Sequence, residues 1–377
     1  MIKRILQQKV EACFFKKKAI IIYGARQVGK TTLIKEVQKK HLKDSLFLNC
    51  DEPDIRASLT NVTSTELKNL IGSKRVVFID EAQRVLNIGL TIKLLVDNFP
   101  DLQVVATGSS ALELSNEIVE PLTGRKYEFH LFPFSMVELQ QKYSLIEIRR
   151  MLEKRMIMGM YPEIVENTDE DQILLKDLAS SYLYKDVLQY QDIRRPELLE
   201  KLLTALALQI GNEVSYNELA NLLGVTKQTV ANYIQLLEKS FVIFRLPPFS
   251  RNLRNELKKL RKIYFYDTGV RNAIINLFNP LHQRLDAGQL WENFMISERI
   301  KWNTNNDVLV NHYFWRTHSQ QEIDYLEDKE GKLSAFEFKW KSFKERVPKA
   351  FVNTYPNSTV EFIRSNNYEE FVGLENK

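Results

Sequence analysis

The stretch "AIIIYGARQVGKTTLIKEV", residues 19–37, decides the fold of the first third of the chain. A short apolar run, residues 19–23, is typical of a buried strand, and it leads into G-x-x-x-x-G-K-[ST] and then a helical segment. In this pattern Gly24 and Gly29 let the main chain wrap around phosphates, Lys30 adds a cation, and Thr31 supplies a hydroxyl for Mg2+. The predicted nucleotide-binding residues in this loop are Gly24, Ala25, Arg26, Gln27, Val28, Gly29, Lys30, Thr31 and Thr32. The alternative, a plain strand-to-helix turn, is disfavoured because spacing, residue types and flanking segments all agree.

A second apolar run ends in acids, as a magnesium nucleotide site requires. In "RVVFIDEAQRV", residues 75–85, a strand over 76–79 is followed by Asp80 and Glu81. Open parallel sheets place ligands at the carboxyl ends of their strands. We expect Asp80 to hold Mg2+ through water together with Thr31, and Glu81 to polarise the attacking water. On its own such a strand end would be read as solvated; its place after a phosphate loop favours the functional reading.

Further strands are predicted at residues 45–49, 102–107 and 126–130, with helical stretches between them, so the first third is predicted to be a parallel α/β sheet. In "TGSS", Ser109 or Ser110 would either sense the γ-phosphate or cap a helix. Arg125 is the candidate arginine finger that would reach a neighbouring subunit, with Arg26 and Arg84 as weaker alternatives. An exposed loop arginine without a role is the ordinary reading of Arg125.

The middle of the chain predicts a helix-turn-helix. Ser215 and Glu218 have capping-box spacing and open a helix that ends near residue 223, Gly224 makes the turn, and Thr226 caps a second helix. The second helix would turn Val230, Ile234 and Leu237 inward, and "FVIFRL", residues 241–246, would begin a wing. Its predicted DNA-contacting side chains are Lys227, Gln228, Asn232 and Gln235. Eight Lys or Arg against two acids between Arg245 and Arg271 predict a basic patch beside it. A protein-binding module with a solvated basic face is the alternative.

The last hundred residues follow the order of the PD-(D/E)-x-K nuclease core. A helix with Glu292 precedes a strand, then "EIDYLED" with Asp324, then "LSAFEFKWK" with Glu337 and Lys339. Asp324 and Glu337 would hold a divalent cation, Glu292 would complete the acidic cluster, and Lys339 would orient or deprotonate water. The alternative is an ordinary hairpin with charged edges.

The composition bounds these readings. The chain has 377 residues, 44% of them hydrophobic and 27% charged, which is typical of a globular protein of two or three domains. Two cysteines are too few for a disulfide framework and favour the cytoplasm. The N-terminal stretch lacks the features of a signal peptide, and no apolar run is long enough to span a membrane, so no membrane partner is expected. The net charge of +5 is only weak support for an anionic partner.

Nearly the whole chain resembles prokaryotic AAA-type P-loop ATP-binding proteins with a C-terminal domain of unknown function. The motifs that carry the resemblance are "GARQVGKTTL", "FIDEAQRV", "ATGSSALEL", "LTGRKYEFHLFPFSMVEL", "KIYFYDTGVRN", "WENF", "WRTHSQQEIDY" and "FEFKWK". At residues 159–163 this sequence reads Gly-Met-Tyr-Pro-Glu where such proteins often have two successive glycines. The resemblance implies an ATPase with ATP and Mg2+ as cofactors, joined to a winged helix and a nuclease-like fold.

These observations predict an α/β chain with four parts: a P-loop ATPase domain (1–140), a helical connector (141–195), a winged helix-turn-helix (196–275) and a small restriction-endonuclease-like α/β domain (276–377). The predicted function is a Mg2+-dependent ATPase that couples nucleotide state to a C-terminal module. The expected partners are ATP, duplex DNA or an unidentified protein, and further copies of the chain. Two alternatives stay open, an ATP-regulated metal-dependent DNA nuclease and an ATP-switched protein scaffold without nucleic acid.

Overall fold

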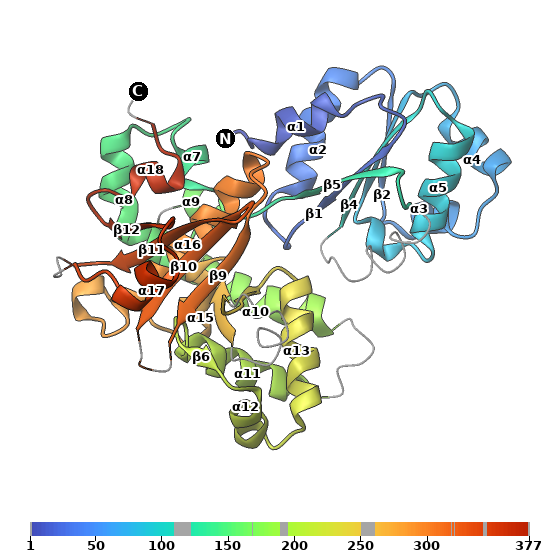
Figure 1. The fold of residues 1–377 in the computed structure, drawn as a ribbon. Coiled ribbons are helices and arrows are strands. Elements are labelled where there is room, and N and C mark those ends of the chain that lie inside the picture. The colour runs from blue at the N-terminus through green and yellow to red at the C-terminus, as the bar shows by residue number, and fades with distance from the viewer. Residues whose placement is uncertain are drawn as a thin grey trace. The chain divides into compact units, whose positions relative to one another are not determined.

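The structure is a computed structural model. It describes residues 2–108, 122–167, 169–188, 195–249, 261–317, 319, 321–341 and 345–375, with side chains in 181–188 left out. The chain divides into two compact units (Figure 1). The N-terminal unit comprises residues 3–132 and 239–241, and the C-terminal unit comprises residues 1–2, 133–238 and 242–377. The finer division of the C-terminal unit into three domains stays a prediction.

A five-stranded, fully parallel sheet forms the centre of the N-terminal unit. Its strands are β1 (Ala19–Tyr23), β2 (Ser45–Asn49), β3 (Val76–Asp80), β4 (Gln103–Gly108) and β5 (Lys126–His130). Their order is β2-β3-β4-β1-β5, so the chain crosses over between neighbours, as parallel pairing requires. Every residue of β1, β3 and β4 is buried, which is why the centres of these strands are apolar. The predicted α/β fold of this part is confirmed.

Helices cover this sheet on both faces. They are α1 (Leu6–Ala12), α2 (Lys30–Gln38), α3 (Pro53–Leu59), α4 (Ser64–Ile71) and α5 (Ile88–Asn98). Figure 1 shows α1 and α2 beside one face and α4 and α5 beside the other. Leu33, Ile34 and Val37 of α2 are buried, which fixes this helix directly after the loop that leaves β1.

The C-terminal unit begins with helices α7 (Met136–Leu139), α8 (Leu145–Met158), α9 (Pro162–Glu166) and α10 (Asp171–Leu188). The last turn of α8 meets the segment before α15 (Thr268–Ile274). There, Asp267 accepts hydrogen bonds from the main-chain N–H of Met160 at 2.7 Å and of Val270 at 3.0 Å. Gly159, with φ 76° and ψ −167°, faces the same carboxylate. This contact joins the connector helices to the second half of the unit.

Three helices and a small antiparallel sheet follow. The helices are α11 (Pro196–Leu208), α12 (Tyr216–Leu223) and α13 (Lys227–Lys239). The strands β6 (Glu213–Val214), β7 (Ile243–Leu246) and β8 (Arg261–Phe265) pair in the order β6-β8-β7. The predicted start of α12 is confirmed, since the Ser215 side chain accepts from Glu218 N; Thr226 likewise caps α13 through Thr229 N. Val230, Ile234 and Leu237 are buried, as the helical spacing predicts.

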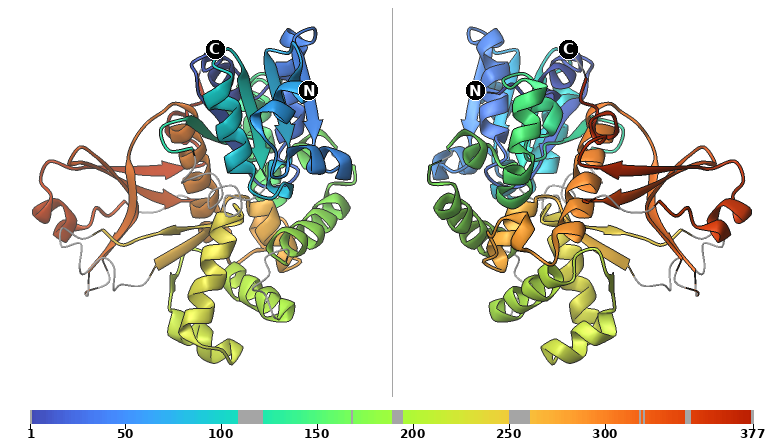
Figure 2. Two further views of the ribbon diagram at one scale, coloured as in Figure 1. Left: turned by 90° about the vertical axis from the view of Figure 1, so that its right-hand side faces the viewer. Right: turned by 90° about the vertical axis from the view of Figure 1, so that its left-hand side faces the viewer.

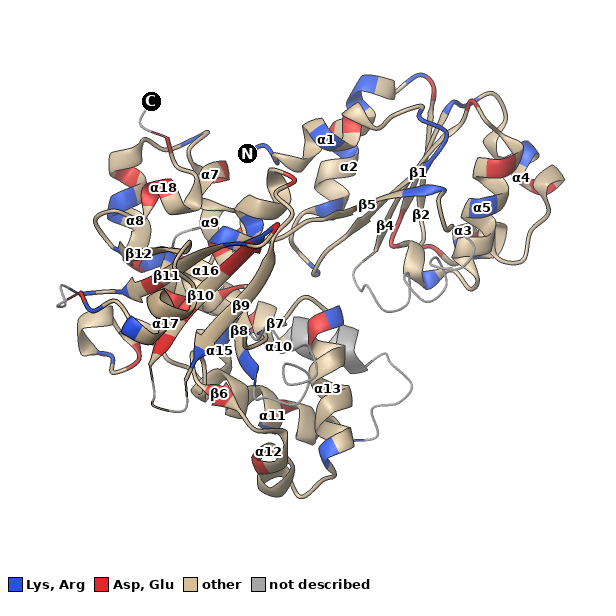
Figure 3. Ribbon diagram, in the orientation of Figure 1, with Lys and Arg blue, Asp and Glu red and all other residues tan. Residues whose placement is uncertain are grey.

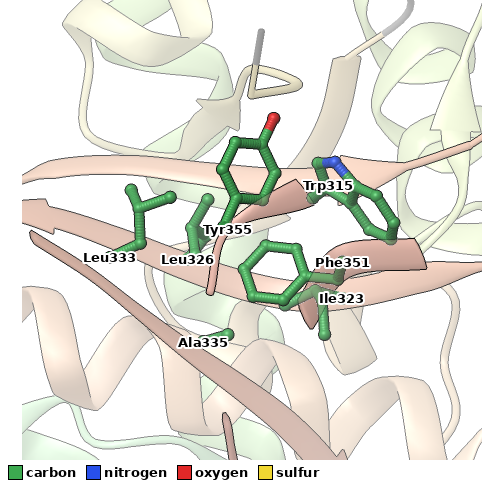
Figure 4. Close-up of a cluster of buried hydrophobic side chains, with 7 residues drawn as sticks. All are labelled: Trp315, Ile323, Leu326, Leu333, Ala335, Phe351 and Tyr355. Carbon is green, nitrogen blue, oxygen red and sulfur yellow. The ribbon is translucent and has the colours of Figure 1, made fainter. Parts of the chain in front are cut away.

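The rest of the unit is a four-stranded sheet between helices. Its order is β12-β11-β10-β9, from β9 (Asn311–Arg316), β10 (Glu322–Lys329), β11 (Lys332–Lys339) and β12 (Thr359–Arg364); only β11 and β12 pair in parallel. Helix α16 (Ala287–Asn305) packs against β11 (Figure 2). Helix α17 (Lys349–Thr354) supplies Phe351 to a buried cluster on the sheet (Figure 4). Helix α18 (Glu369–Val372) follows β12. The helix and the three strands predicted up to residue 341 are confirmed, whereas β12, α17 and α18 were not predicted.

Candidate functional site

The phosphate loop joins β1 to α2 as the sequence predicts. Its first glycine lies so close to the residue directly after β5 that a Cβ at Gly24 would stand 2.3 Å from the carbonyl oxygen of Leu131. Lys30 is buried at the first position of α2, and its Nζ donates to the carbonyl oxygens of Gly24 and Ala25 at 2.9 and 2.8 Å. The ammonium is therefore held inside the loop, where the phosphates of a nucleotide would lie.

Asp80 connects the loop to the sheet. Its Oδ2 accepts from Thr31 Oγ1 at 2.7 Å, and its Oδ1 accepts from the hydroxyl of Thr107. The carboxylate is 3% exposed, so both of its oxygens have a fixed orientation. Thr31 and Asp80 are hard oxygen donors on adjacent elements, which is the donor set that Mg2+ takes when water and phosphate complete its shell. The residues present fit the ion that the sequence predicts here.

Glu81 follows in a left-handed conformation, with φ 53° and ψ 42°. Its main-chain N–H donates to Thr107 Oγ1 at 3.2 Å, and its Oε2 accepts from Gln83 Nε2 at 2.5 Å. A non-glycine residue in this region costs free energy and persists where neighbours enforce it, often at functional sites. In this turn one hydroxyl, that of Thr107, contacts both the main chain of Glu81 and the carboxylate of Asp80.

Thr107 was missed from the sequence, although it contacts both acids. The parallel register pairs Ile79 with Ala106, so Asp80, the last residue of β3, and Thr107, the last residue but one of β4, lie side by side. The sequence did contain a signal for Thr107, because this hydroxyl residue ends the predicted strand 102–107, the next strand after the one that ends in Asp80. The predicted sensor residues Ser109 and Ser110 lie outside the described residues.

The three candidate arginines lie at different places. Arg125 carries the carbonyl that accepts from Ala19 N, so it stands at the amino edge of the sheet, about 16 Å along β1 from the phosphate loop. Its side chain pairs with Asp97 at 2.7 Å. Arg84 lies at the carboxyl edge and pairs with Asp51 at 2.6 Å, and Arg26 lies within the loop. Arg125 therefore could serve only the site of another chain.

The predicted DNA-contacting side chains share one exposed face. Lys227, Gln228, Asn232 and Gln235 of α13 are all exposed. The basic patch predicted beside them needs correction, because Lys262 and Arg271 are 2% exposed and point into the protein. Arg245 is paired with Glu238 at 2.5 Å, and the four basic residues between 251 and 259 lie outside the described residues.

The four residues of the predicted nuclease site do come together. Glu292, Asp324, Glu337 and Lys339 line one pocket of about 660 Å³. Lys339 Nζ lies 2.8 Å from Glu337 Oε2 and 3.5 Å from Asp324 Oδ2, and Asp324 also accepts from Phe338 N at 2.9 Å. Figure 3 marks the acidic positions on α16, β10 and β11 and the basic ones on β8 and β11.

Burial sets the protonation of this pocket. It raises the pKa of Glu292 to about 7, against the opposing charge of Lys262. Burial and the charge of Asp324 raise the pKa of Glu337 to about 7 as well. Glu337 Oε1 is buried without a hydrogen-bond partner. Carboxylates with raised pKa values are typical of functional pockets.

A divalent cation does not fit this pocket as it stands. Across the residues that the structure describes, no three His, Cys, Asp or Glu side chains are arranged to hold a metal ion. Sequence reasoning also missed Lys262, Tyr264 and Glu322. Lys262 and Tyr264 bind Glu292, while Glu322 pairs with Lys262. A lysine at the start of the strand-like run "KIYFY", residues 262–266, was the signal for this network.

Comparison with known proteins assigns the N-terminal part. Residues 16–140 match a model described as an AAA domain. Residues 149–281 and 287–371 match two domains of unknown function, DUF8612 and DUF4143. The match over residues 16–140 places the N-terminal part among AAA-type P-loop ATPase domains. The other two matches assign no function.

Two relatives of similar length have no assigned function, and one solved structure shares part of the fold. An uncharacterized protein of Methanocaldococcus jannaschii is 26% identical over 377 residues, covering 92% of this chain and 81% of its own length. An uncharacterized protein of Mycobacterium bovis is 26% identical over 325 residues, covering 85% of this chain and 70% of its own length. The solved structure of a Walker-type ATPase of Pyrococcus abyssi has 16% identity and a TM-score of 0.50, covering 71% of this chain and 94% of its own.

None of the described helices has the length and apolar character to span a bilayer.

Proposed function

We propose that the chain is a Mg2+-dependent ATPase whose nucleotide state controls a C-terminal binding module. The observation that carries this proposal is the network in which Thr31, Asp80 and Thr107 meet beside Glu81 at the carboxyl edge of the parallel sheet. Lys30 and the loop amides would bind the phosphates, and Thr31 and Asp80 would hold the metal. Glu81 would orient and deprotonate water, so catalysis is by positioning and electrostatic stabilisation.

Phosphate release from ATP tests this function. With Mg2+ present we expect steady turnover by the full chain, and with the metal chelated by excess EDTA we expect turnover to stop. The metal shields the phosphate charge and is part of the reacting complex, so its removal should not leave partial activity. Turnover that is the same with and without Mg2+ would contradict the proposed roles of Thr31 and Asp80.

We also propose that α11–α13 with the β6-β8-β7 sheet form a winged helix-turn-helix that contacts duplex DNA through α13. Three facts support this. Helices α12 and α13 are joined by a turn at Gly224, the paired strands β7 and β8 follow α13 as a wing would, and the four polar side chains of α13 are exposed. Lysine and amide side chains on such a helix suit phosphates and base edges.

Lys227→Ala is expected to weaken duplex binding and to lower the slope of log affinity against log salt by about 1, because one phosphate contact is lost. Gel shifts over a salt series measure this. Lys201→Ala is the matched control, since it removes an exposed lysine from α11 of the same module and should change neither quantity. If the chain binds no DNA even at low salt, the ATP-switched protein scaffold becomes the better account.

Arg125 is proposed to act on the ATP of a neighbouring copy. Turnover per chain should then rise with protein concentration, and Arg125→Ala should lower the plateau by roughly 10³-fold, the effect of losing an arginine finger. Asp97→Ala removes the ion-pair partner but leaves the guanidinium, so it should retain turnover. A turnover per chain that does not change with concentration would rule out this role.

The metal-dependent nuclease is the rival for the C-terminal pocket. The convergence of Glu292, Asp324, Glu337 and Lys339 on one pocket favours it, and the lack of a three-ligand cluster in the described residues counts against it. We therefore propose binding without cleavage. The cytoplasmic location expected from the cysteine content is likewise kept as a proposal.

A further inference from the structure

The pocket of the C-terminal unit contains a buried cation of its own. Lys262, in the middle strand β8 of the three-stranded sheet, projects toward residues from α16 and β10. Its Nζ lies 3.0 Å from Glu292 Oε1 and also pairs with Glu322 Oε1. The same ammonium stands over the ring of Phe314, 5.5 Å from its centroid. The side chain is 2% exposed, so these groups, and not water, compensate its charge.

The surroundings keep this lysine charged. Burial opposes the charge, but Glu292, Asp324 and Glu322 outweigh it and hold the pKa of Lys262 well above its ordinary value. Tyr264 donates to the same oxygen of Glu292 that receives the ammonium. Two donors from β8, Lys262 and Tyr264, thus fix the position of Glu292 in a buried hydrogen-bond network.

A divalent cation would need the oxygens that these donors use. Mg2+ and Mn2+ bind carboxylates through free lone pairs in a compact shell. Here Glu292 and Glu322 face Lys262, while Asp324 and Glu337 face Lys339. Glu337 Oε1 is buried and has no hydrogen-bond partner. Lys262 and Lys339 therefore each pair with two of the four carboxylates that a single metal ion would need to bind together.

We infer that Lys262 is a permanent cation in place of a divalent metal, so that the C-terminal pocket is a metal-independent binding site and not a working nuclease centre. This inference goes beyond the proposed ATPase function and does not depend on ATP hydrolysis. It predicts that the metal site is recoverable, because all its acids remain in the pocket.

Removal of the ammonium should uncover a metal site. In Lys262→Met the side chain keeps most of its volume but loses its charge, so Glu292, Glu322 and Asp324 lose the cation that separates them. Mn2+ would then relieve their repulsion. We expect Lys262→Met to gain one Mn2+ per chain, bound at least about tenfold more tightly than any Mn2+ at this pocket in the parent.

The measurement is Mn2+ binding by electron paramagnetic resonance to the full chain without nucleotide. All proteins carry Asp80→Asn, so that the ATP site contributes no metal. The Mn2+ ion that Lys262→Met gains should not bind to the double variant that carries both Lys262→Met and Glu337→Gln. The matched control is Lys301→Met, which removes another buried lysine of the same unit, paired with Glu298 at 2.7 Å, and should gain no Mn2+.

Two outcomes would overturn the inference. One is a folded Lys262→Met chain, checked by circular dichroism, that gains no Mn2+. The other needs no Lys262 variant: the parent chain binds Mn2+, or cuts linear or supercoiled DNA in Mn2+, and Glu337→Gln abolishes it. If Lys262→Met does not fold, the inference is tested by comparing the parent with Glu337→Gln. The inference is supported if neither protein binds Mn2+ at this pocket and neither cuts DNA in Mn2+.

Discussion

Glu81→Gln is expected to bind ATP as the parent chain does and to lose ATP turnover by roughly 10²–10⁴-fold, the usual effect of removing a general base. The amide keeps the shape of the side chain and a hydrogen-bonding oxygen for Gln83, but it cannot accept the proton of the attacking water. The Thr107 contact is made by the main-chain N–H of residue 81, so it survives the substitution. Turnover is measured as phosphate release and binding by a fluorescent ATP analogue.

Glu52→Gln is the matched control for this experiment. It makes the same chemical change at an exposed acid that follows β2 at the same edge of the sheet, so turnover should remain close to that of the parent. A Glu81→Gln chain that hydrolyses ATP at the normal rate would remove Glu81 from the mechanism and turn attention to the other acid of the pair, Asp80.

Gly159→Ala is expected to lower the free energy of unfolding of the C-terminal unit by roughly 3 to 5 kcal/mol. The main chain at Gly159 lies in a region that side chains avoid. A Cβ there would also stand 2.0 Å from Asp267 Oδ1, so the carboxylate would have to move away from the N–H groups of Met160 and Val270. A displaced carboxylate that is buried and loses its donors adds a further cost.

Tryptophan fluorescence in urea measures this effect selectively. All four tryptophans, Trp291, Trp302, Trp315 and Trp340, belong to the C-terminal unit, so the signal reports its unfolding alone. Gly224→Ala is the control: its φ is also positive, at 65°, but a Cβ would meet nothing within 4 Å, so only about 1 kcal/mol of backbone strain is expected. Equal losses in the two variants would show that the Asp267 contact is unimportant.

The parts of the fold with local signals could be predicted from the sequence. The strand and loop before Lys30 were correctly predicted because an apolar run, glycine spacing and a following helix coincide within residues 19–37. Ser215 and Thr226 were correctly predicted as caps for the same reason. Each of these signals depends on residues within a few positions of one another, so no knowledge of the tertiary fold is needed.

Residues whose roles depend on distant partners could not be assigned in this way. Thr107 contacts Asp80 because β3 and β4 are neighbours, and the sheet order had to be known first. Lys262 was placed in a basic surface patch because its sequence neighbours are basic, whereas its buried partners come from α16 and β10. Gly159 was noted only as a departure from a family pattern, since the reason for it, Asp267, lies far along the chain.

The most direct test of the central claim compares the full chain with Lys30→Ala, measuring ATP binding and phosphate release on the same preparations. Lys30 is held within the phosphate loop by Gly24 and Ala25, so its loss removes the cation that the phosphates would meet. The account predicts that the parent binds and hydrolyses MgATP and that Lys30→Ala does neither. Equal hydrolysis by both proteins would contradict it, since the activity would then arise outside this site.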